Sequence, residues 1–217
     1  MKNKRLTVII PVYNQADKIT IGLNSIPSDP RIEIIVVDDG STDQTFETVC
    51  CYMDDCQDKQ IELFRFPENK GVSYAVNEGL DKAQGEYVVL LGSDGDYFLP
   101  DTIKKALDEW LTGEDLIFYD IIDNTGHIRR LRENTVRRYP GSTKFMRREF
   151  VGDTRCPINR RRAEDVTFTR QLLDKNPTMK FLCQTVKHYN FPREGSLTWN
   201  ARHGVTDRLG FKREKNV

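Results

Sequence analysis

The chain has 217 residues, of which 38% are hydrophobic and 30% are charged, and this fits one globular domain with a sizeable core. Its longest apolar runs, such as 34–37 and 87–91, are far shorter than the roughly 18 residues that a membrane span needs. The basic residues 1–5 are followed by too short an apolar stretch for a secretory signal, so no membrane span and a cytoplasmic location are expected.

The net charge is zero, but the charges are unevenly distributed along the chain. Residues 1–125 contain 11 Lys and Arg and 24 Asp and Glu, a net charge of −13. Residues 126–217 contain 22 and 9, a net charge of +13. This asymmetry suggests that the second part of the chain meets an anionic molecule.

The first hundred residues alternate between two periodicities. Short runs rich in β-branched residues predict strands, and segments with helical spacing lie between them. This alternation is typical of βαβ units and a mostly parallel, Rossmann-like sheet flanked by helices. Ser41 and Gln44 have the spacing of a capping box for the second helix. In chain order we expect strand 6–10, helix 16–25, strand 32–37, helix 42–55, strand 61–66, helix 72–83 and strand 86–91.

The pattern is less regular after residue 100. Pro100 and Asp101 predict the start of a helix that runs to about Leu111. A small antiparallel hairpin is expected next, because a turn at 124–126 separates two short apolar runs. The remaining expectations are hairpin strands 116–122 and 127–131, helices near 143–150 and 164–173, and one or two short strands in 180–188.

No internal repeat or clear linker divides the sequence. The simplest organisation is therefore a single α/β domain over residues 1–217. Its first part, 1–100, carries the motifs of a ligand site, 101–198 forms a second functional half, and 199–217 is a polar basic tail.

Three polar motifs follow predicted strands: residues 11–14, 38–41 and 92–96. Ligands of open parallel sheets bind beyond the carboxyl ends of the strands. Three such motifs therefore predict one ligand crevice at that edge. Asp38 and Asp39 could accept hydrogen bonds from a nucleobase or a ribose there, or they could serve only as acids at a helix start with Ser41 as the cap.

Asp94 and Asp96 place two carboxylates on a turn, and Gly95 between them lets the backbone bend so that both can converge. Mg²⁺ and Mn²⁺ prefer oxygen ligands and often share them with substrate phosphates. An ordinary turn before a helix is the alternative, but the position at a strand end favours a metal site.

Four segments together resemble the signature series of family 2 glycosyltransferases with the GT-A fold. They are 8–14, 34–43, 69–77 and 92–100. The resemblance is close over about 5–112 and weaker to about 198. It implies an inverting transferase that uses a nucleotide diphosphate sugar, by family habit a UDP-sugar, together with Mn²⁺ or Mg²⁺.

The resemblance also implies roles for single residues. Pro11 and Tyr13 would line the nucleobase pocket, and Asp39 with Asp38 would contact the base. Lys70 would lie near the base or the phosphates. The family usually has Asp-x-Asp-Asp before its Tyr-x-x-Pro, whereas Gly95 stands here where an aspartate is common. Asp94 and Asp96 would serve the ribose and the metal, and which of them binds the metal directly is open.

In the second half, Glu164 and Asp165 resemble the family's Glu-Asp motif at a helix start, where the aspartate is the general base. An acid that only complements the helix dipole is the alternative. Residues 188–198 resemble the closing segment of the family. There Arg193 would neutralise the leaving diphosphate, and His188 is either a metal ligand or structural. Glu164 and the run Arg160, Arg161 and Arg162 are expected near the acceptor, although the arginines could equally form a solvated loop.

The acceptor stays open between a neutral glycan precursor, an anionic polymer of the teichoic-acid type, and DNA with hydroxylated bases. A nucleotidyltransferase is the alternative enzyme, but it usually needs a glycine-rich loop after the first strand, and here the first glycine is Gly22. An inactive nucleotide-sugar-binding module is the third possibility. The oligomeric state is not predicted.

Overall fold

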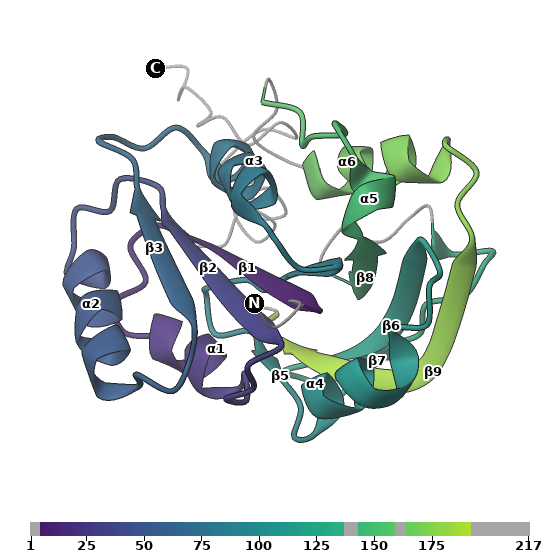
Figure 1. The fold of residues 1–217 in the computed structure, drawn as a ribbon, viewed down its shortest axis with the longest axis horizontal. Helices are drawn as coiled ribbons and strands as arrows, with labels where there is room; N and C mark the ends of the chain where they lie inside the picture. Colours follow the sequence, from purple (N-terminus) through teal and green to yellow (C-terminus); the bar gives the residue numbers. More distant parts are fainter. Residues whose placement is uncertain (1–4, 137–142, 159–163, 192–217) are drawn as a thin grey trace, which may run out of the picture.

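The computed structural model describes residues 5–136, 143–158 and 164–191. In these ranges one mixed sheet is covered by helices on both faces (Figure 1). The strand order is β3-β2-β1-β4-β8-β6-β9-β5, and the short β7 pairs with β6. The predicted α/β class with a mostly parallel sheet is therefore confirmed.

The elements of the first half occur in the predicted order. β1 pairs in parallel with both β2 and β4, and β2 pairs in parallel with β3. The side chains of β1, β2 and β4 are almost all buried, as expected for strands that are covered on both faces. The bounds are β1 (Leu6–Val12), α1 (Ile19–Asn24), β2 (Ile32–Asp38), α2 (Thr45–Asp55), β3 (Ile61–Arg65), α3 (Val72–Lys82) and β4 (Tyr87–Leu90).

The second half differs from the prediction in several elements. The expected hairpin is present with a short return strand, and β9 is one long strand where short ones were expected. The helix after Pro100 starts later, because Asp101 adopts a left-handed conformation with φ of 60°. The bounds are β5 (Tyr97–Phe98), α4 (Thr102–Lys105), the π-helical turn η1 (Ala106–Trp110), β6 (Leu116–Asp123), β7 (Ile128–Arg129), β8 (Lys144–Arg147), α5 (Arg148–Val151), α6 (Glu164–Leu173) and β9 (Met179–Tyr189).

The predicted helix near 143–150 is wrong. Residues 144–147 form β8, which pairs antiparallel with both β4 and β6, and only one helical turn, α5, follows. Phe145 and Met146 are both fully buried but pack into the cores on opposite faces of the sheet. Long-range strand pairing has therefore overridden the local helical spacing.

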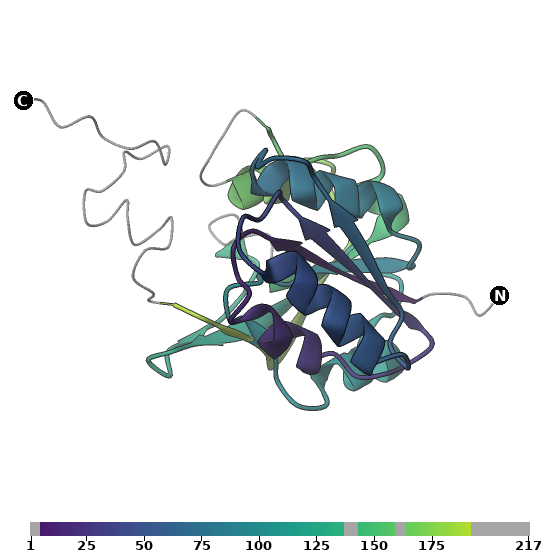
Figure 2. The ribbon, with the colours of Figure 1, turned by 90° about the vertical axis from the view of Figure 1, so that its left-hand side faces the viewer.

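The helices form two layers. α1, α2 and the α4–η1 segment pack on one face of the sheet, and α3, α5 and α6 pack on the other. In Figure 2, α3 and α6 lie along the top of the strands, with α1 and α2 below them. None of the described helices is long and apolar enough to cross a bilayer.

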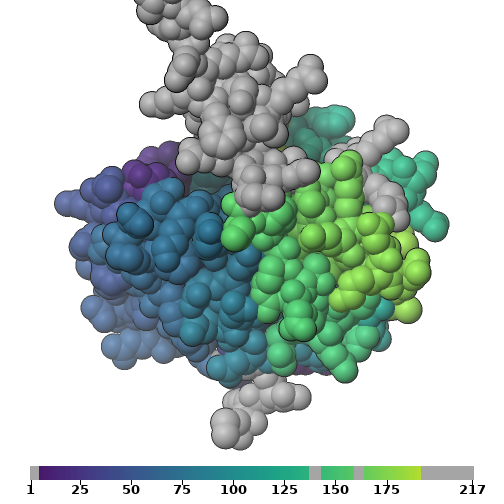
Figure 3. Space-filling model, turned by 90° about the horizontal axis from the view of Figure 1, so that it is seen from above, coloured from purple at the N-terminus to yellow at the C-terminus, as the bar shows by residue number. Residues whose placement is uncertain are grey.

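α3 joins the two halves of the molecule on its own face. The side-chain Nδ2 of Asn77 donates to the backbone carbonyl of Cys156 (2.9 Å), and the backbone amide of Cys156 donates to Asn77 Oδ1 (2.8 Å). Arg155 donates to Asp81 of the same helix (2.8 Å). Seen from above in Figure 3, the blue surface of α3 meets the green surface around α5 and α6.

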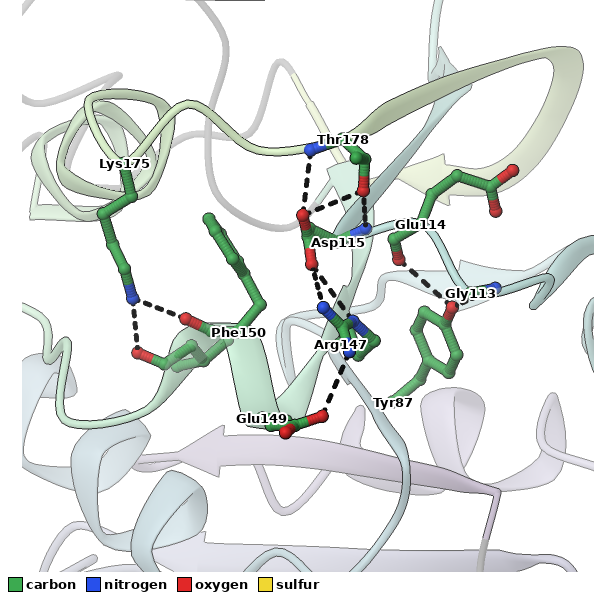
Figure 4. A network of polar contacts seen from close by, with 10 residues as sticks. Tyr87, Gly113, Glu114, Asp115, Arg147, Glu149, Phe150, Lys175 and Thr178 are labelled. Atoms are coloured by element: carbon green, nitrogen blue, oxygen red, sulfur yellow. Dashed lines mark hydrogen bonds and ion pairs between the residues drawn. The ribbon is translucent and has the colours of Figure 1, made fainter.

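A polar network closes the edge of the sheet where β6 and β9 begin (Figure 4). The Asp115 carboxylate accepts from Arg147 Nε on β8 (3.0 Å) and from the backbone amide of Thr178 (2.8 Å). Arg147 also pairs with Glu149 (3.0 Å). Carboxylate, guanidinium and backbone groups satisfy one another at this edge.

Several basic residues of 126–217 form ion pairs with acidic residues of 1–125. Arg132 pairs with Asp120 (2.8 Å) and Lys187 with Asp96 (3.0 Å). The pairs of Arg147 with Asp115 and of Arg155 with Asp81 follow the same pattern. Part of the charge asymmetry is thus used inside the fold.

Candidate active site

The carboxyl ends of β3, β2, β1, β4, β6 and β9 lie along one edge of the sheet, because these strands run in the same direction. All three polar motifs singled out in the sequence follow strands of this set. The structure adds the end of β6, and it brings the end of β9, where the candidate metal ligand His188 lies, to the same edge. This edge is where a ligand of such a sheet binds.

The loops after β1 and β2 are joined by Asn14. Its backbone amide donates to Ser41 Oγ (2.9 Å), and its Oδ1 accepts from the amide of Thr42 (2.8 Å). The predicted capping box at the start of α2 is therefore wrong. Ser41 contacts the neighbouring loop, while Asp43 Oδ1 accepts from the amide of Thr45 (3.0 Å). The result is one fixed polar surface built from two strand ends.

Asp38 is fully buried beneath this surface. Its Oδ1 accepts from the Ser41 amide (2.9 Å), and its Oδ2 forms an ion pair with Arg65 Nε (3.3 Å). Arg65 ends β3, donates to the carbonyl of Ser41 (3.0 Å) and lies over the Phe46 ring. Asp38 therefore supports the loop, and Arg65 is a contributor that the sequence analysis missed.

Asp39 holds the loop before α3. Its Oδ1 accepts from the Lys70 amide (2.8 Å), and its Oδ2 accepts from the Gly71 amide (2.8 Å) and from Asn69 Nδ2 (2.9 Å). Burial raises the pKa of Asp39, and the two backbone amides partly offset this rise. A carboxylate oxygen can accept two hydrogen bonds, so Oδ1 keeps acceptor capacity for a ligand.

Three other predicted donor contacts lie beside these loops. Tyr13 directly follows β1 and is 41% exposed. Pro11 lies within β1 opposite Val37 of β2 and is half-buried. Lys70 is exposed, and its ammonium lies over the Phe66 ring, 4.9 Å from the centroid. These positions fit a flat ligand with an anionic end, and the assigned contacts remain predictions.

The carboxylate of Asp96 is enclosed. It is only 2% exposed, and Oδ2 lies 3.0 Å from the ammonium of Lys187, which is fully buried. Oδ1 accepts from the backbone amide of Asn190 (2.9 Å). Both partners come from the end of β9, more than 90 residues away in the sequence.

Asp94 is half-buried and lies on the more open part of the same turn. Its carbonyl accepts from Asn190 Nδ2 (2.6 Å). Gly95 has φ of +99°, and an added Cβ would lie 2.7 Å from the Asn190 amide. Both carboxylates approach Gly92 closely. A Cβ added to Gly92 would lie 3.2 Å from Asp94 Oδ1 and 2.9 Å from Asp96 Oδ2. The two carboxylates thus converge, as predicted.

Asp165 and Glu164 begin α6, where acids are favoured by the helix dipole. Thr169 Oγ1 donates to the carbonyl of Asp165 (2.8 Å) and accepts from the buried Lys144 (2.9 Å). Burial lowers the pKa of Lys144 to about 8. Burial also raises the pKa of Glu164, whose Oε2 is enclosed and has no hydrogen-bond partner among the described residues.

Tyr189, the last residue of β9, is affected by acids of both halves. Its pKa is raised to about 12, mainly by burial and to a smaller extent by the negative charges of Asp96, Asp94 and Asp165. Arg129 lies over its ring, 5.8 Å from the centroid. The charges of the turn after β4 and of the start of α6 therefore both act on this phenol.

The predicted roles of His188 and of four arginines are not tested by the structure. The ring of His188 stacks on Tyr97, with centroids 4.6 Å apart, and stacking accounts for its position, so its role as a metal ligand remains a prediction. Arg160, Arg161, Arg162 and Arg193 lie outside the described residues.

Sequence reasoning gave no role to four residues of the site. They are Arg65, Lys187, Tyr189 and Asn190, although the last two lie in the segment 188–198 that resembles the closing segment of the family. Arg65 could have been found, because it ends a predicted parallel strand at the same edge. The others depend on the pairing of β9 with β5 and β6, for which the sequence offers no local signal.

A divalent metal fits this site through one carboxylate. No group of three or more His, Cys, Asp or Glu side chains in the described ranges could hold a metal ion. Mg²⁺ commonly binds through one or two carboxylates and takes its other ligands from water and substrate phosphates. Asp94 has the exposure for this role, whereas Asp96 is only 2% exposed and pairs with the buried Lys187.

Comparison with protein families identifies the family of this chain. Residues 7–191 match the model of glycosyl transferase family 2, and the chain belongs to this family. Solved structures agree with the predicted GT-A fold. Staphylococcus aureus TarS 1–349 in complex with UDP-GlcNAc has a TM-score of 0.74 at 26% identity, covering 88% of this chain and 60% of that one. A mannosyltransferase of Pyrobaculum calidifontis, solved with GDP-Man and Mn²⁺, has a TM-score of 0.74 at 23% identity, covering 94% and 62%, and supports the fold alone.

Two curated relatives each match about half of this chain. An uncharacterized glycosyltransferase of Haemophilus influenzae is 40% identical over 105 residues, which are 48% of this chain and 41% of that protein. The putative teichuronic acid biosynthesis glycosyltransferase TuaG of Bacillus subtilis is 38% identical over 105 residues, 48% and 40% of the two chains. The aligned parts are about two fifths of the length of these relatives.

Proposed function

We propose that this chain transfers a sugar from a nucleotide diphosphate donor, a UDP-sugar, to an acceptor hydroxyl. Family membership and the likeness to TarS, solved with UDP-GlcNAc, support the reaction class. The observation that carries the proposal is the convergence of the Asp94 and Asp96 carboxylates beyond the end of β4, at the same edge of the sheet as the loops after β1 and β2. This edge offers acids for a metal next to a polar surface suited to a nucleotide.

The donor nucleotide lies on the loops after β1 and β2. Asp39 accepts from the base through the remaining capacity of Oδ1, and Tyr13 packs on the base. Lys70 faces the phosphates. These loops hold one another through Asn14 and Ser41, so the surface is fixed before the donor arrives and little binding energy is spent on ordering it.

Asp94 would hold the divalent metal, which when bound would supply positive charge against the negative charge that develops on the leaving diphosphate. The chain itself fixes Asp94 through the hydrogen bond from Asn190 to its carbonyl. Arg193 adds a second positive charge for the diphosphate.

Asp165 is the general base of a direct displacement with inversion. It takes the proton of the acceptor hydroxyl while that oxygen forms a bond to the anomeric carbon, and the bond from that carbon to the diphosphate breaks. The electron pair leaves with the nucleoside diphosphate. The hydrogen bond from Thr169 to the Asp165 carbonyl holds the first turn of α6 during this step.

The acceptor is an anionic glycan in this proposal. The name of the relative TuaG and the excess of basic residues after 126 support it. The ion pairs between the halves reduce that excess. The acceptor side of the proposal therefore rests mainly on Arg160, Arg161 and Arg162, with Glu164 beside them.

Product analysis tests the reaction. The full chain is incubated with a panel of nucleotide sugars and Mn²⁺, with and without an anionic glycan, and the nucleotide products are identified. We expect release of free UDP from a UDP-sugar and inversion at the anomeric carbon of the product. Release of pyrophosphate would identify a nucleotidyltransferase, and donor binding without turnover would identify an inactive binding module.

A further inference from the structure

The ion pair between Asp96 and Lys187 is closed off from solvent. Asp96 is 2% exposed and Lys187 is 0% exposed. The second carboxylate oxygen is taken by the Asn190 amide (2.9 Å). Taking two charges out of water is costly unless each is fully paired, so a pair that is this enclosed needs a reason in the structure or the function of the site.

We propose that Asp96 is a positioning residue whose permanent cation is the ammonium of Lys187, and that it does not bind the metal of the donor. The pair fixes the acidic turn so that Asp94 alone faces the donor. This inference rests on the proposed function only for the role of Asp94. Moving Asp96 onto a metal would leave the Lys187 ammonium buried without its counter-charge, which is strongly unfavourable.

The surroundings of the pair support a fixed turn. Asn190 donates from its backbone to Asp96 and from its side chain to the Asp94 carbonyl. Its Oδ1 accepts from Asn124 Nδ2 at the end of β6 (2.7 Å). The side chain of Asn190 also fills the space over Gly95. The turn is therefore held on both sides of its glycine.

Strand pairing explains how Lys187 reaches Asp96. β5 follows the turn directly and pairs with the end of β9, where Phe98 is opposite Lys187. On its other side β9 pairs with β6, and a register shift near Asp120 precedes the pairing of Ile121 with Lys187. Such irregularities re-aim side chains, and here β9 is placed to supply the cation.

One competing arrangement has to be excluded. Asp94 Oδ1 and Asp96 Oδ2 both lie close to the position of a Cβ on Gly92. Two converging oxygens could share one metal if Lys187 moved away. The two arrangements make opposite predictions for a variant in which both charges of the pair are removed.

The test uses the double variant Asp96→Asn/Lys187→Met, which keeps the size of both side chains and leaves no buried charge. Binding of Mn²⁺ in the presence of UDP is followed by electron paramagnetic resonance of free Mn²⁺. We expect affinity within about threefold of wild type, because the neutral side chains keep the shape of the turn and Asn190 still holds it. Asp94→Asn removes the ligand itself and should lose at least the roughly 10-fold that the loss of a residue supporting a metal ligand costs. A loss in the double variant as large as that in Asp94→Asn overturns the proposal.

Unfolding measurements separate this proposal from the proposed function. In urea, Asp96→Asn and Lys187→Met should each lower the midpoint, and the double variant should recover much of the loss, because the lone buried charge is gone. Additive losses overturn the pairing whether or not the enzyme uses a metal. If wild type binds no Mn²⁺, the metal role of Asp94 is wrong. The urea unfolding of the two single variants and the double variant then decides alone whether Asp96 and Lys187 form a pair.

A measurement on wild type covers the case in which the double variant does not fold. The ¹⁵N signal of the Lys187 ammonium, assigned by its loss in Lys187→Arg, is observed during titration with Mg²⁺ and UDP. We expect the protected signal to persist at saturation, because the pair stays closed. Its disappearance on metal binding would mean that Asp96 has exchanged Lys187 for the metal.

Discussion

The loops after β1 and β2 and the acidic turn after β4 are built in different ways. In the loops, polar contacts join segments about thirty residues apart, as between Asn14 and Ser41 (27 residues) or Asp39 and Lys70 (31 residues). Where the acidic turn meets the second half, the partners are far apart, as between Asp96 and Lys187 (91 residues) or Asp94 and Asn190 (96 residues).

This difference indicates a division of work. The donor loops are organised within successive βαβ units, so they can form a nucleotide surface with little help from the rest of the chain. The acidic turn takes its shape from contacts with Lys187 and Asn190 at the end of β9. Changes in the loops and at Asp94 should therefore affect nucleotide affinity, whereas changes in the second half of the chain should affect turnover and stability.

The largest effect should come from Asp165→Asn. Removing a general base costs about 10²- to 10⁴-fold in rate, so kcat for UDP release in the presence of acceptor should fall by that amount. UDP affinity measured by calorimetry should not change, because the nucleotide lies on the other half. Glu133→Gln, an exposed neutral replacement, is the control. Near-normal turnover in Asp165→Asn would show that another group takes the proton.

Lys144→Met should alter how stability depends on pH. The pKa of Lys144 is lowered from 10.5 to about 8 by burial, so the folded state favours the neutral amine. Such a depressed pKa stabilises the fold at pH above the unfolded value, and this stability is lost as the pH falls through the folded value. Relative to Lys144→Met, wild type should therefore gain up to about 3 kcal/mol between pH 8 and 10.5.

Urea unfolding of both proteins at a series of pH values from 7 to 10.5 checks this prediction. Lys104→Met, at an exposed lysine of α4, is the matched control and should leave the pH dependence unchanged. Parallel stability curves for wild type and Lys144→Met would contradict a buried, shifted amine at this position.

Asp94→Asn should reduce Mn²⁺-dependent UDP affinity by about 10- to 100-fold and leave UDP affinity in EDTA almost unchanged. The reason is that the carboxylate acts on the nucleotide through the metal. Asp101→Asn is the control, because Asp101 is exposed and its left-handed conformation suits asparagine. Equal losses with and without EDTA would mean that Asp94 contacts the nucleotide directly, as in the ribose role that the sequence left open.

The same difference in contact range explains what the sequence could predict. The strands, helices and motifs of the first half were correctly ordered because local periodicity and short loops define βαβ units. β8 was mistaken for a helix because its four residues are held by β4 and β6, not by local preference. The convergence of Asp94 and Asp96 was predictable from Gly95, but the partner of Asp96 was not, since nothing near it in the sequence points to Lys187.

The smallest and most specific effect concerns the acceptor. If Arg160, Arg161 and Arg162 contact an anionic polymer, each contact should release bound counterions and add about 0.9 to the negative slope of log affinity against log salt, as for DNA. Replacing all three by Ala should flatten that slope by up to about 2.7 and leave UDP affinity unchanged. Fluorescence anisotropy with a labelled anionic glycan, and separately with duplex DNA, measures the slope.

The control is Lys104→Ala/Lys105→Ala, which removes two exposed cations of α4 and controls for net charge alone. A steeper slope with DNA than with the glycan would favour a nucleic-acid acceptor. An affinity that does not depend on salt for either polymer would mean that the excess of Lys and Arg in 126–217 has no polyanionic partner. It would favour a neutral sugar as the acceptor.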